Sequence, residues 1–383
     1  MNNSYKALLL SGTPIIDVRS PAEFIQGSLP ASINVPLLDD RQRQQVGTCY
    51  KKHGQKEAVE LGHRLLTPAI REQRLNDWVS FAENNPGCHL MCFRGGLRSQ
   101  SVQEFLVQSG FHLPVIQGGY KSVRREILDV MLSTVTSLQM LVLAGRTGTG
   151  KTRLLHQLPF TIDLEALANH RGSSFGRMLT EQPSTATFEN ALIVELVAAR
   201  EKQQQQRGRH QPLVFEDEAR LIGRVALPEL LKDKLAVSPA VVLEEPVDVR
   251  VELARQDYVD ELSQLYCEKV TECSVDPVDT ELCRQQGLDE FAECHRKSLL
   301  KIKKRLGGDR YATALALFDK GFAHHVSTDD TDGYDEFIRY LLKNYYDPMY
   351  DYQMTCKSRQ VVFRGDAVSI KDWFSTAGLK SAN

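Results

Sequence analysis

The 383-residue chain lacks any apolar run long enough to cross a membrane, because a membrane-spanning helix needs about 18 to 20 consecutive apolar residues. The run Ala7-Leu8-Leu9-Leu10 is also too short for the core of a signal peptide. The net charge of −2 gives no overall attraction to nucleic acid, so any such surface must be a local patch. We therefore expect a cytoplasmic protein of two or three domains with no membrane partner.

The cysteine pattern argues against two further classes. Eight cysteines are spaced irregularly along a long chain, which favours free thiols over a disulfide framework. No two of them form a C-x2-C pair, so the group Cys267, Cys273, Cys283 and Cys294 does not predict a zinc site. We expect no metal bound by cysteine.

One stretch carries a highly specific pattern. The apolar run Leu141 to Ala144 leads into the sequence G-x-x-x-x-G-K-T, and a helix is expected after it. In such a phosphate-binding loop (P-loop), glycines let backbone N–H groups converge on an oxyanion, the lysine supplies a positive charge, and the threonine hydroxyl can hold a magnesium ion. The residues expected to bind phosphate are Gly145, Gly148, Gly150, Lys151 and Thr152. We expect Mg²⁺ at this loop and no tightly bound cofactor.

A cysteine ends another predicted strand. His89 to Met91 is followed by Cys92 and a C-x5-R loop that enters a helix near Arg98. Backbone N–H groups of the loop, the helix dipole and Arg98 all favour an anion there, and they lower the pKa of the thiol, while Arg94 adds positive charge. The alternative is a buried and inert cysteine. We predict that Cys92, Arg94 and Arg98 are catalytic.

Short strands and helices alternate throughout this N-terminal region. Asp17-x-Arg19, the stretch Gly27 to Pro36, the Cys92 loop and Gly118-Gly119-Tyr120 together resemble a rhodanese domain, the sulfurtransferase fold whose loop cysteine carries a persulfide. The resemblance implies a first α/β domain at residues 1–130. The loop is one residue longer than in common sulfurtransferases and has the length found in rhodanese-fold phosphatases, so we expect a larger anion than sulfane sulfur.

A second α/β domain is predicted at residues 137–383, after a polar joint near Ser133 to Ser137. We expect the fold of P-loop NTPases, a buried parallel sheet with helical additions. Pro212 to Glu218 is a predicted strand that ends in acids, and Glu216 is the expected carboxylate for magnesium or for polarising water. Glu218 shares its face.

The pattern from Val249 onward is helical. The basic run Arg296 to Arg305 contains no acid, and its residues Lys301, Lys304 and Arg305 are predicted to contact RNA phosphates, with a solvated helix face as the alternative. The segment Tyr345 to Tyr352 supplies aromatic rings for stacking on bases, or for a packed C-terminal lid.

The two domains in this order, with C-x-R-G-G-x-R-S in the first and G-R-T-G-T-G-K-T in the second, closely resemble the tRNA 2-selenouridine synthase family across essentially the whole chain. Further segments also resemble that family: Asp163-Leu164-Glu165, His170 to Gly176, Gln182-Pro183, Glu216-x-Glu218 and Tyr346 to Tyr350.

The resemblance implies a bacterial-type cytosolic transferase that acts on 2-thiouridine at the wobble position of tRNA. It would attach a geranyl group from geranyl diphosphate to the sulfur and then replace the geranylthio group with selenium from selenophosphate. The P-loop would bind the diphosphate leaving group, and Cys92 would either carry selenium as a perselenide or assist attack by selenophosphate. A selenophosphate-supplying enzyme would be a second partner besides tRNA.

Two other classes fit part of the pattern. A nucleotide or RNA kinase, with the rhodanese domain as a phosphatase or regulator, needs a lid arginine and a catalytic acid, and Glu216 could serve as that acid. A non-catalytic RNA-binding adaptor would leave both anion-binding loops without a role. Binding and hydrolysis of ATP distinguish the kinase from the transferase.

Overall fold

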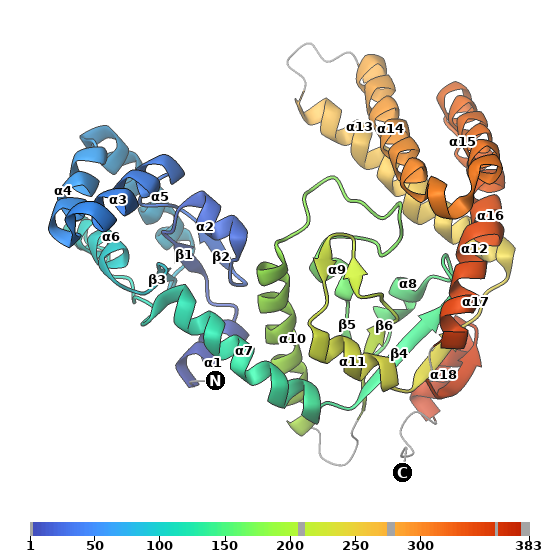
Figure 1. Ribbon diagram of the computed structural model, residues 1–383, viewed down its shortest axis with the longest axis horizontal. Helices are drawn as coiled ribbons and strands as arrows, with labels where there is room; N and C mark the ends of the chain where they lie inside the picture. Colours follow the sequence, from blue (N-terminus) through green and yellow to red (C-terminus); the bar gives the residue numbers. More distant parts are fainter. Residues whose placement is uncertain (1–2, 206–210, 274–279, 357–358, 377–383) are drawn as a thin grey trace. The chain divides into compact units, whose positions relative to one another are not determined.

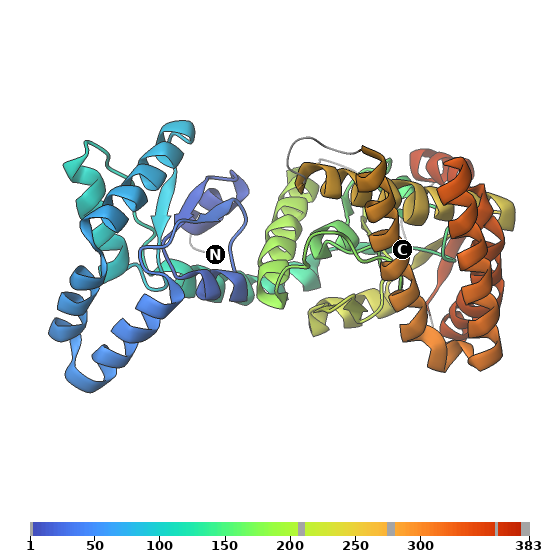
Figure 2. The same ribbon diagram turned by 90° about the horizontal axis from the view of Figure 1, so that it is seen from above.

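The computed structural model describes residues 3–205, 211–273, 280–356 and 359–376. The chain forms two compact units, drawn as ribbons in Figures 1 and 2: Met1–Thr136 with Pro183–Ala198, and Ser137–Gln182 with Ala199–Asn383. Each unit contains a parallel sheet with helices, which confirms the predicted α/β class. Within the described ranges, every helix is too short or too polar to cross a membrane.

The first unit is built on a three-stranded parallel sheet of order β2-β1-β3. Its central strand is buried at all three residues. The strands are β1 (Ile15–Asp17), β2 (Ser32–Asn34) and β3 (His89–Met91). The helices are α1 (Asn3–Leu10), α2 (Pro21–Gln26), α3 (Asp40–His53), α4 (Gln55–Leu65), α5 (Pro68–Asn84), α6 (Leu97–Gln108), α7 (Gly119–Ser137) and part of α10 (Thr185–Gln205).

The end of this unit agrees only in part with the sequence-based expectation. Val115 forms a single parallel bridge with Leu90, and the turn at Gln117 and Gly118 leads directly into α7, which begins at Gly119. The boundary between the units lies after Thr136, within the predicted polar joint near Ser133 to Ser137, but this segment is helical and forms the last part of α7. Its polar sequence does not break the helix, because Thr134 and Val135 are buried and hold the segment in place.

The start of α10 belongs to the first unit although it lies in the sequence after the P-loop. Ile193, Val194 and Val197 pack in one hydrophobic cluster with residues of the sheet and of α7, including Ile15 and Ile127. The chain thus returns from the second unit to the first at Pro183–Ala198. The domain ranges expected from the sequence, 1–130 and 137–383, do not include this return.

The second unit has a five-stranded parallel sheet of order β10-β9-β4-β6-β5. The central strand is buried at all six residues, as expected of an apolar run with helices on both faces. The strands are β4 (Met140–Gly145), β5 (Thr161–Ile162), β6 (Leu213–Glu216), β9 (Ala240–Leu243) and β10 (Val361–Gly365). Leu143 pairs with Glu216, so Glu216 ends its strand beside the start of the P-loop.

Short helices accompany this sheet, and β7 (Leu221–Ile222) pairs with β8 (Val225–Ala226) in a small hairpin. The helices next to the sheet are α8 (Lys151–Leu155), α9 (Leu164–Ala168), α11 (Glu229–Val237) and α18 (Ala367–Thr376).

A helical region follows β9, and α13 and α14 lie side by side in it (Figure 1). Its elements are α12 (Val247–Arg255), η1 (Gln256–Asp260), α13 (Glu261–Cys273), α14 (Thr280–Leu306), α15 (Gly308–Thr328), η2 (Asp332–Tyr334), α16 (Asp335–Leu341), η3 (Leu342–Tyr346) and α17 (Asp347–Cys356). Aromatic side chains such as Phe291, Phe318 and Phe337 form its core. Two of the elements, η1 and η3, are π-helical turns.

Candidate functional site

The Cys92 loop connects β3 to α6 and is supported from behind by the start of α7. The Tyr120 N–H donates to Cys92 O at 2.9 Å, and the Lys121 N–H donates to Phe93 O at 3.0 Å. A Cβ atom at Gly119 would lie 2.2 Å from Cys92 O, so only glycine allows this approach. The Gly118-Gly119-Tyr120 sequence therefore shapes the cysteine loop.

Asp17 and Arg19 hold one wall of the same site. The Arg19 Nη2 atom donates to Asp17 Oδ2 at 2.6 Å and to Gly27 O at 2.7 Å. The guanidinium also lies 3.9 Å from the centre of the Tyr120 ring, which is a cation–π contact. Both charged residues are almost completely buried and paired with each other, which suits a supporting role in this wall.

The surroundings of Cys92 favour its thiolate form. Burial alone raises the pKa of Cys92, but the Ser99 hydroxyl, the N–H groups of Arg94 and Ser99, and the charge of Arg98 outweigh it, so the pKa is lowered overall. Ser99 Oγ is buried and makes no other hydrogen bond within the described residues, which leaves it available to the sulfur. Ser99 was not among the predicted catalytic residues.

Removal of the Ser99 hydroxyl tests this account. Because a hydrogen bond to a charged group contributes about 1.5 to 3 kcal/mol, Ser99→Ala should raise the pKa of Cys92 and slow its alkylation by iodoacetamide at pH 7 by roughly tenfold. The rate is followed for the Cys92 peptide by mass spectrometry across pH 5 to 10. Ser101→Ala, on the same helix but not among the groups that act on the thiol, should leave the profile unchanged. If the pH profile of alkylation is the same for Ser99→Ala as for the wild type, the lowered pKa of Cys92 is due to the backbone N–H groups and Arg98 alone.

The three predicted catalytic residues line one cleft in the first unit. Arg94 is exposed, whereas Arg98 is already paired with Glu23, whose Oε2 lies 2.5 Å from Arg98 Nη1. Neither the Cys92 loop motif nor the segment around Glu23 indicated that ion pair. An anion bound at the loop would therefore compete with Glu23 for Arg98.

The cleft has a volume of about 1240 Å³, far more than a selenophosphate ion requires. The hairpin of α3 and α4, blue in Figures 1 and 2, supplies a large part of its wall. Basic and aromatic side chains from this hairpin face the cleft, among them Arg43, Tyr50, Lys51 and His63. Such a lining suits a phosphate-bearing ligand with a planar base.

The P-loop in the second unit has the backbone that its glycines allow. Gly148 and Gly150 have φ values of 81° and 76°. Lys151 Nζ lies 3.0 Å from Gly145 O, so its ammonium group is directed back over the loop. The predicted phosphate ligands of this loop are thus gathered at the carboxyl end of β4, where α/β sheets ordinarily bind ligands.

The segment Tyr346 to Tyr350 holds the P-loop from outside. Asp347 Oδ1 lies 2.6 Å from Arg250 Nη2, and Arg250 Nε donates to Thr147 O at 2.9 Å. Arg146, in the loop itself, pairs with Asp351 at 2.7 Å. Tyr345 and Tyr346 are both buried, which favours the packed alternative over base stacking for these two rings.

Three carboxylates meet beside the P-loop. One oxygen atom from each of Glu165, Glu216 and Glu218 lies within 4.8 Å of the others. Glu216 is fully buried, and neither of its carboxylate oxygens has a partner at good hydrogen-bond geometry among the described residues, although the Thr152 hydroxyl is near enough to lower its pKa. Burial raises the pKa of Glu216, and the charge of Glu218 raises it further; burial and then Glu216 do the same for Glu165.

A divalent cation fits this arrangement, because buried carboxylates without partners are costly unless they are protonated or bound to a cation. Thr152 Oγ1 lies 3.5 Å from Glu165 Oε2, which brings the predicted magnesium-binding hydroxyl to the same place. Glu165 was missed as a site residue. The sequence signal for it was the segment Asp163-Leu164-Glu165 directly after β5.

The basic run on α14 divides into two parts. Arg296 pairs with Asp319 at 2.8 Å and Lys297 with Glu293 at 3.2 Å. Lys301, Lys304 and Arg305 are exposed, lie on one face of the helix by their spacing, and make no ion pair within the described ranges. These three residues form the basic face of α14.

Comparison with known proteins agrees with both units. Residues 138–380 match the family model described as tRNA 2-selenouridine synthase AAA domain, and residues 1–126 match the rhodanese-like domain. The tRNA 2-selenouridine synthase of Marinobacter nauticus is 42% identical over 374 residues, which is 97% of this chain and 96% of that protein. The chain belongs to the tRNA 2-selenouridine synthase family.

Other members of the family are similarly close. The tRNA 2-selenouridine synthase of Hahella chejuensis is 42% identical over 382 residues, covering 99% of this chain and 95% of its own. That of Sulfurovum sp. is 40% identical over 370 residues, covering 97% and 96%. As a member of the tRNA 2-selenouridine synthase family, the chain is a tRNA-modifying enzyme with a rhodanese unit and a P-loop unit.

Proposed function

We propose that the enzyme converts 2-thiouridine at the tRNA wobble position into 2-selenouridine in two steps, and that it does so in the cytoplasm. In the first step the sulfur attacks C1 of geranyl diphosphate and the C–O bond breaks, which releases diphosphate. In the second, selenium from selenophosphate displaces the geranylthio group, and water takes up the phosphoryl group. The observation that carries this proposal is the presence of two separate anion-binding loops, one next to a low-pKa thiol and one next to a carboxylate cluster.

The P-loop unit suits the first step. Lys151 and the loop N–H groups would stabilise the negative charge that develops on the leaving diphosphate. Glu165, Glu216 and Glu218 with Thr152 would hold Mg²⁺, which supplies further neutralisation of the diphosphate charge when bound. No hydrolysis of a nucleotide is required in this scheme.

The rhodanese unit suits the second step. The Cys92 thiolate would assist transfer of selenium at the selenide level, while Arg94 and Arg98 would hold the selenophosphate anion. A perselenide on Cys92 would in addition require a two-electron oxidant, because selenium in selenophosphate is already at the selenide level. The size of the cleft supports entry of the modified nucleotide itself, with Arg43 and Lys51 beside its phosphates and Tyr50 beside its base. A selenophosphate-supplying enzyme would be the upstream partner.

The decisive experiment is mass spectrometry of wobble nucleosides from cells with and without the gene. Loss of 2-selenouridine together with loss of its geranylated precursor, and retention of 2-thiouridine, is the expected result. Unchanged nucleosides would contradict the proposal.

The basic face of α14 is proposed to contact tRNA phosphates. Replacing Lys301, Lys304 and Arg305 by Gln should weaken tRNA binding, and the slope of log K against log salt should fall by about 0.7 to 0.9 for each phosphate interaction that is removed. Lys320→Gln serves as the control, since Lys320 on α15 is already paired with Glu336 at 2.8 Å. Binding of tRNA is measured by filter retention between 50 and 300 mM salt. An unchanged slope for the triple variant would show that these residues form a solvated helix face and do not contact tRNA.

A further inference from the structure

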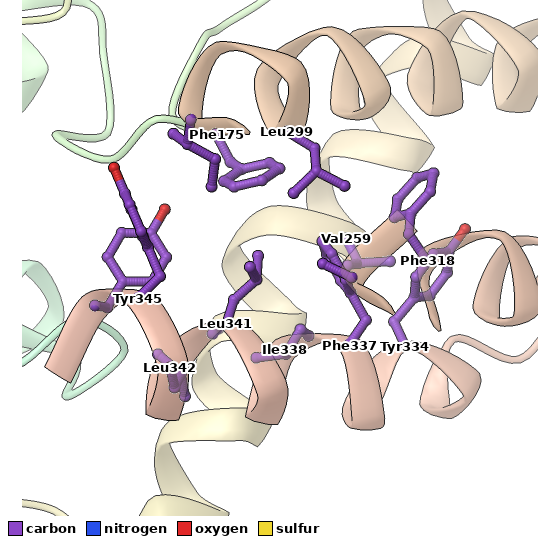
Figure 3. Close-up of a cluster of buried hydrophobic side chains, with 14 of the residues drawn as sticks. Phe175, Val259, Leu299, Phe318, Tyr334, Phe337, Ile338, Leu341, Leu342 and Tyr345 are labelled. Carbon is purple, nitrogen blue, oxygen red and sulfur yellow. The ribbon is translucent and has the colours of Figure 1, made fainter. Parts of the chain in front are cut away.

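A small apolar cavity lies at the tip of the P-loop in the second unit. Its volume is about 40 Å³. Thr147 of the P-loop and the loop residues Ser173 and Phe175 line it, and helical side chains that include Ile338 and Leu341 complete the lining. Figure 3 shows Phe175, from its loop, on the side of the cluster opposite the helix that carries both Leu341 and Phe337.

The cavity carries no formal charge. His295 is the one ionisable imidazole in its lining, and burial lowers the pKa of His295 to about 4, so the ring is neutral at physiological pH. The remaining polar side-chain groups in the lining are hydroxyls. They belong to Thr147, Ser173, Tyr258 and Tyr346. Such a lining favours a hydrocarbon over a nucleoside, whose sugar and base need several hydrogen-bond partners.

Two irregular helical turns meet at this cavity. Tyr258 and Val259 come from the π turn η1, and Leu342 and Tyr346 come from the π turn η3, almost ninety positions further along the chain. A π turn disrupts the regular helical hydrogen bonding and is found frequently at functional sites. In η1 the carbonyl of Tyr258 lies 3.1 Å from His295 Nε2, so a side chain of the cavity lining supports the distorted backbone.

The cavity lies close to the proposed diphosphate site, because Thr147 of the P-loop is part of its lining. Gly172, next to Ser173, is packed against the carboxylate cluster: a Cβ atom there would lie 2.1 Å from Glu165 Oε1 and 3.0 Å from Glu218 Oε1. Burial and then the charge of Glu165 raise the pKa of Tyr258, so this ring borders both the cluster and the cavity. A diphosphate ester held at Lys151 would therefore have the cavity within reach of its organic part.

We propose that this cavity, here named the tail cavity and bounded by Thr147, Phe175, Tyr258, Ile338, Leu341 and Tyr346, receives the hydrocarbon chain of the prenyl diphosphate and sets the chain length that the enzyme accepts. The proposal rests on the proposed function of the P-loop. The free cavity is smaller than a ten-carbon chain, so its side chains must move on binding, and the two π turns are the parts of the lining least constrained by regular helical hydrogen bonds.

The test compares geranyl diphosphate with inorganic diphosphate as ligands of the full-length protein. Their dissociation constants are measured by calorimetry with Mg²⁺ for the wild type and for Ile338→Trp, which fills the cavity. Because burial of one large aliphatic group changes affinity by about tenfold or more, Ile338→Trp should weaken geranyl diphosphate at least tenfold and leave diphosphate within about twofold. Leu299→Trp is the matched control, since Leu299 is buried in the same core but does not line the cavity.

A second variant enlarges the cavity, so its effect cannot arise from crowding of the core by a larger side chain. Leu341→Ala should shift the preference from geranyl toward the fifteen-carbon farnesyl diphosphate by about fivefold or more. Equal binding of geranyl diphosphate and diphosphate by the wild type would overturn the tail cavity while sparing the P-loop assignment. Equal effects of Ile338→Trp and Leu299→Trp on the affinity for geranyl diphosphate would also overturn the tail cavity. Binding of neither ligand by the wild type would instead overturn the proposed function, and the tail cavity with it.

Discussion

The Cys92→Ser enzyme should form geranylated tRNA at close to the wild-type rate and no 2-selenouridine. Serine preserves the shape of the loop, but its hydroxyl stays protonated at neutral pH, whereas the surroundings of Cys92 lower the pKa of the thiol. The P-loop and its carboxylate cluster belong to the other unit, so the change leaves them intact. Geranylated tRNA should therefore accumulate.

The reaction is assayed with 2-thiouridine tRNA, geranyl diphosphate and selenophosphate, and the nucleosides are identified by mass. Cys49→Ser is the control, because Cys49 is a free cysteine of the same unit that does not line the cleft. Arg98→Ala should impair selenium transfer less than Cys92→Ser, since Arg94 and the loop N–H groups remain. Normal yields of 2-selenouridine from Cys92→Ser would remove Cys92 from the mechanism, and loss of geranylation as well would show that the two steps are not separable.

The Lys151→Ala enzyme should lose geranylation by about a hundredfold or more. The ammonium group is the one positive charge that the P-loop sequence pattern directs at the leaving diphosphate, and removal of a single group that stabilises transition-state charge typically costs 10²- to 10³-fold in rate. Rates are measured under single-turnover conditions with saturating tRNA. If pre-geranylated tRNA is supplied, selenium transfer should continue.

Arg153→Ala provides the matched control for loss of charge. Arg153 lies on the same short helix, but its guanidinium pairs with Asp257 at 2.6 Å. Its removal should change geranylation by less than about threefold, the range expected for an exposed ion pair. Tight magnesium-dependent binding and hydrolysis of ATP by the wild type, with no affinity for geranyl diphosphate, would favour the kinase alternative.

The parts of the fold that local sequence determines were predictable. Glycine positions, an apolar run and a following helix define the P-loop, and β4 and α8 are found where these signals place them. The same holds for the loop between β3 and α6, where a strand, a cysteine and a helix start are contiguous. In such segments the backbone conformation depends on residues only a few positions apart.

The features that were missed depend on contacts between distant segments. Glu165 joins Glu216 because β5 lies beside β6 in the sheet, and strand order is not encoded by either segment alone. The ion pair of Arg98 with Glu23 likewise joins α6 to α2, which are separated by three helices in the sequence. The boundary between the units does fall in the joint predicted at Ser133 to Ser137, but burial of Thr134 and Val135 keeps this polar segment helical.

Synthesis of the protein must accommodate the return of the chain to its first unit. Domains usually fold as they leave the ribosome, N-terminal first. Here the cluster around Ile15 and Ile127 is completed only by Ile193, Val194 and Val197. Between Thr136 and Ala198 the ribosome adds 198 − 136 = 62 residues, which takes roughly 3 to 12 s at 5 to 20 residues per second. Throughout that interval the apolar face that α10 later covers stays open on the nascent chain, at a time when β4 and the P-loop have already been made.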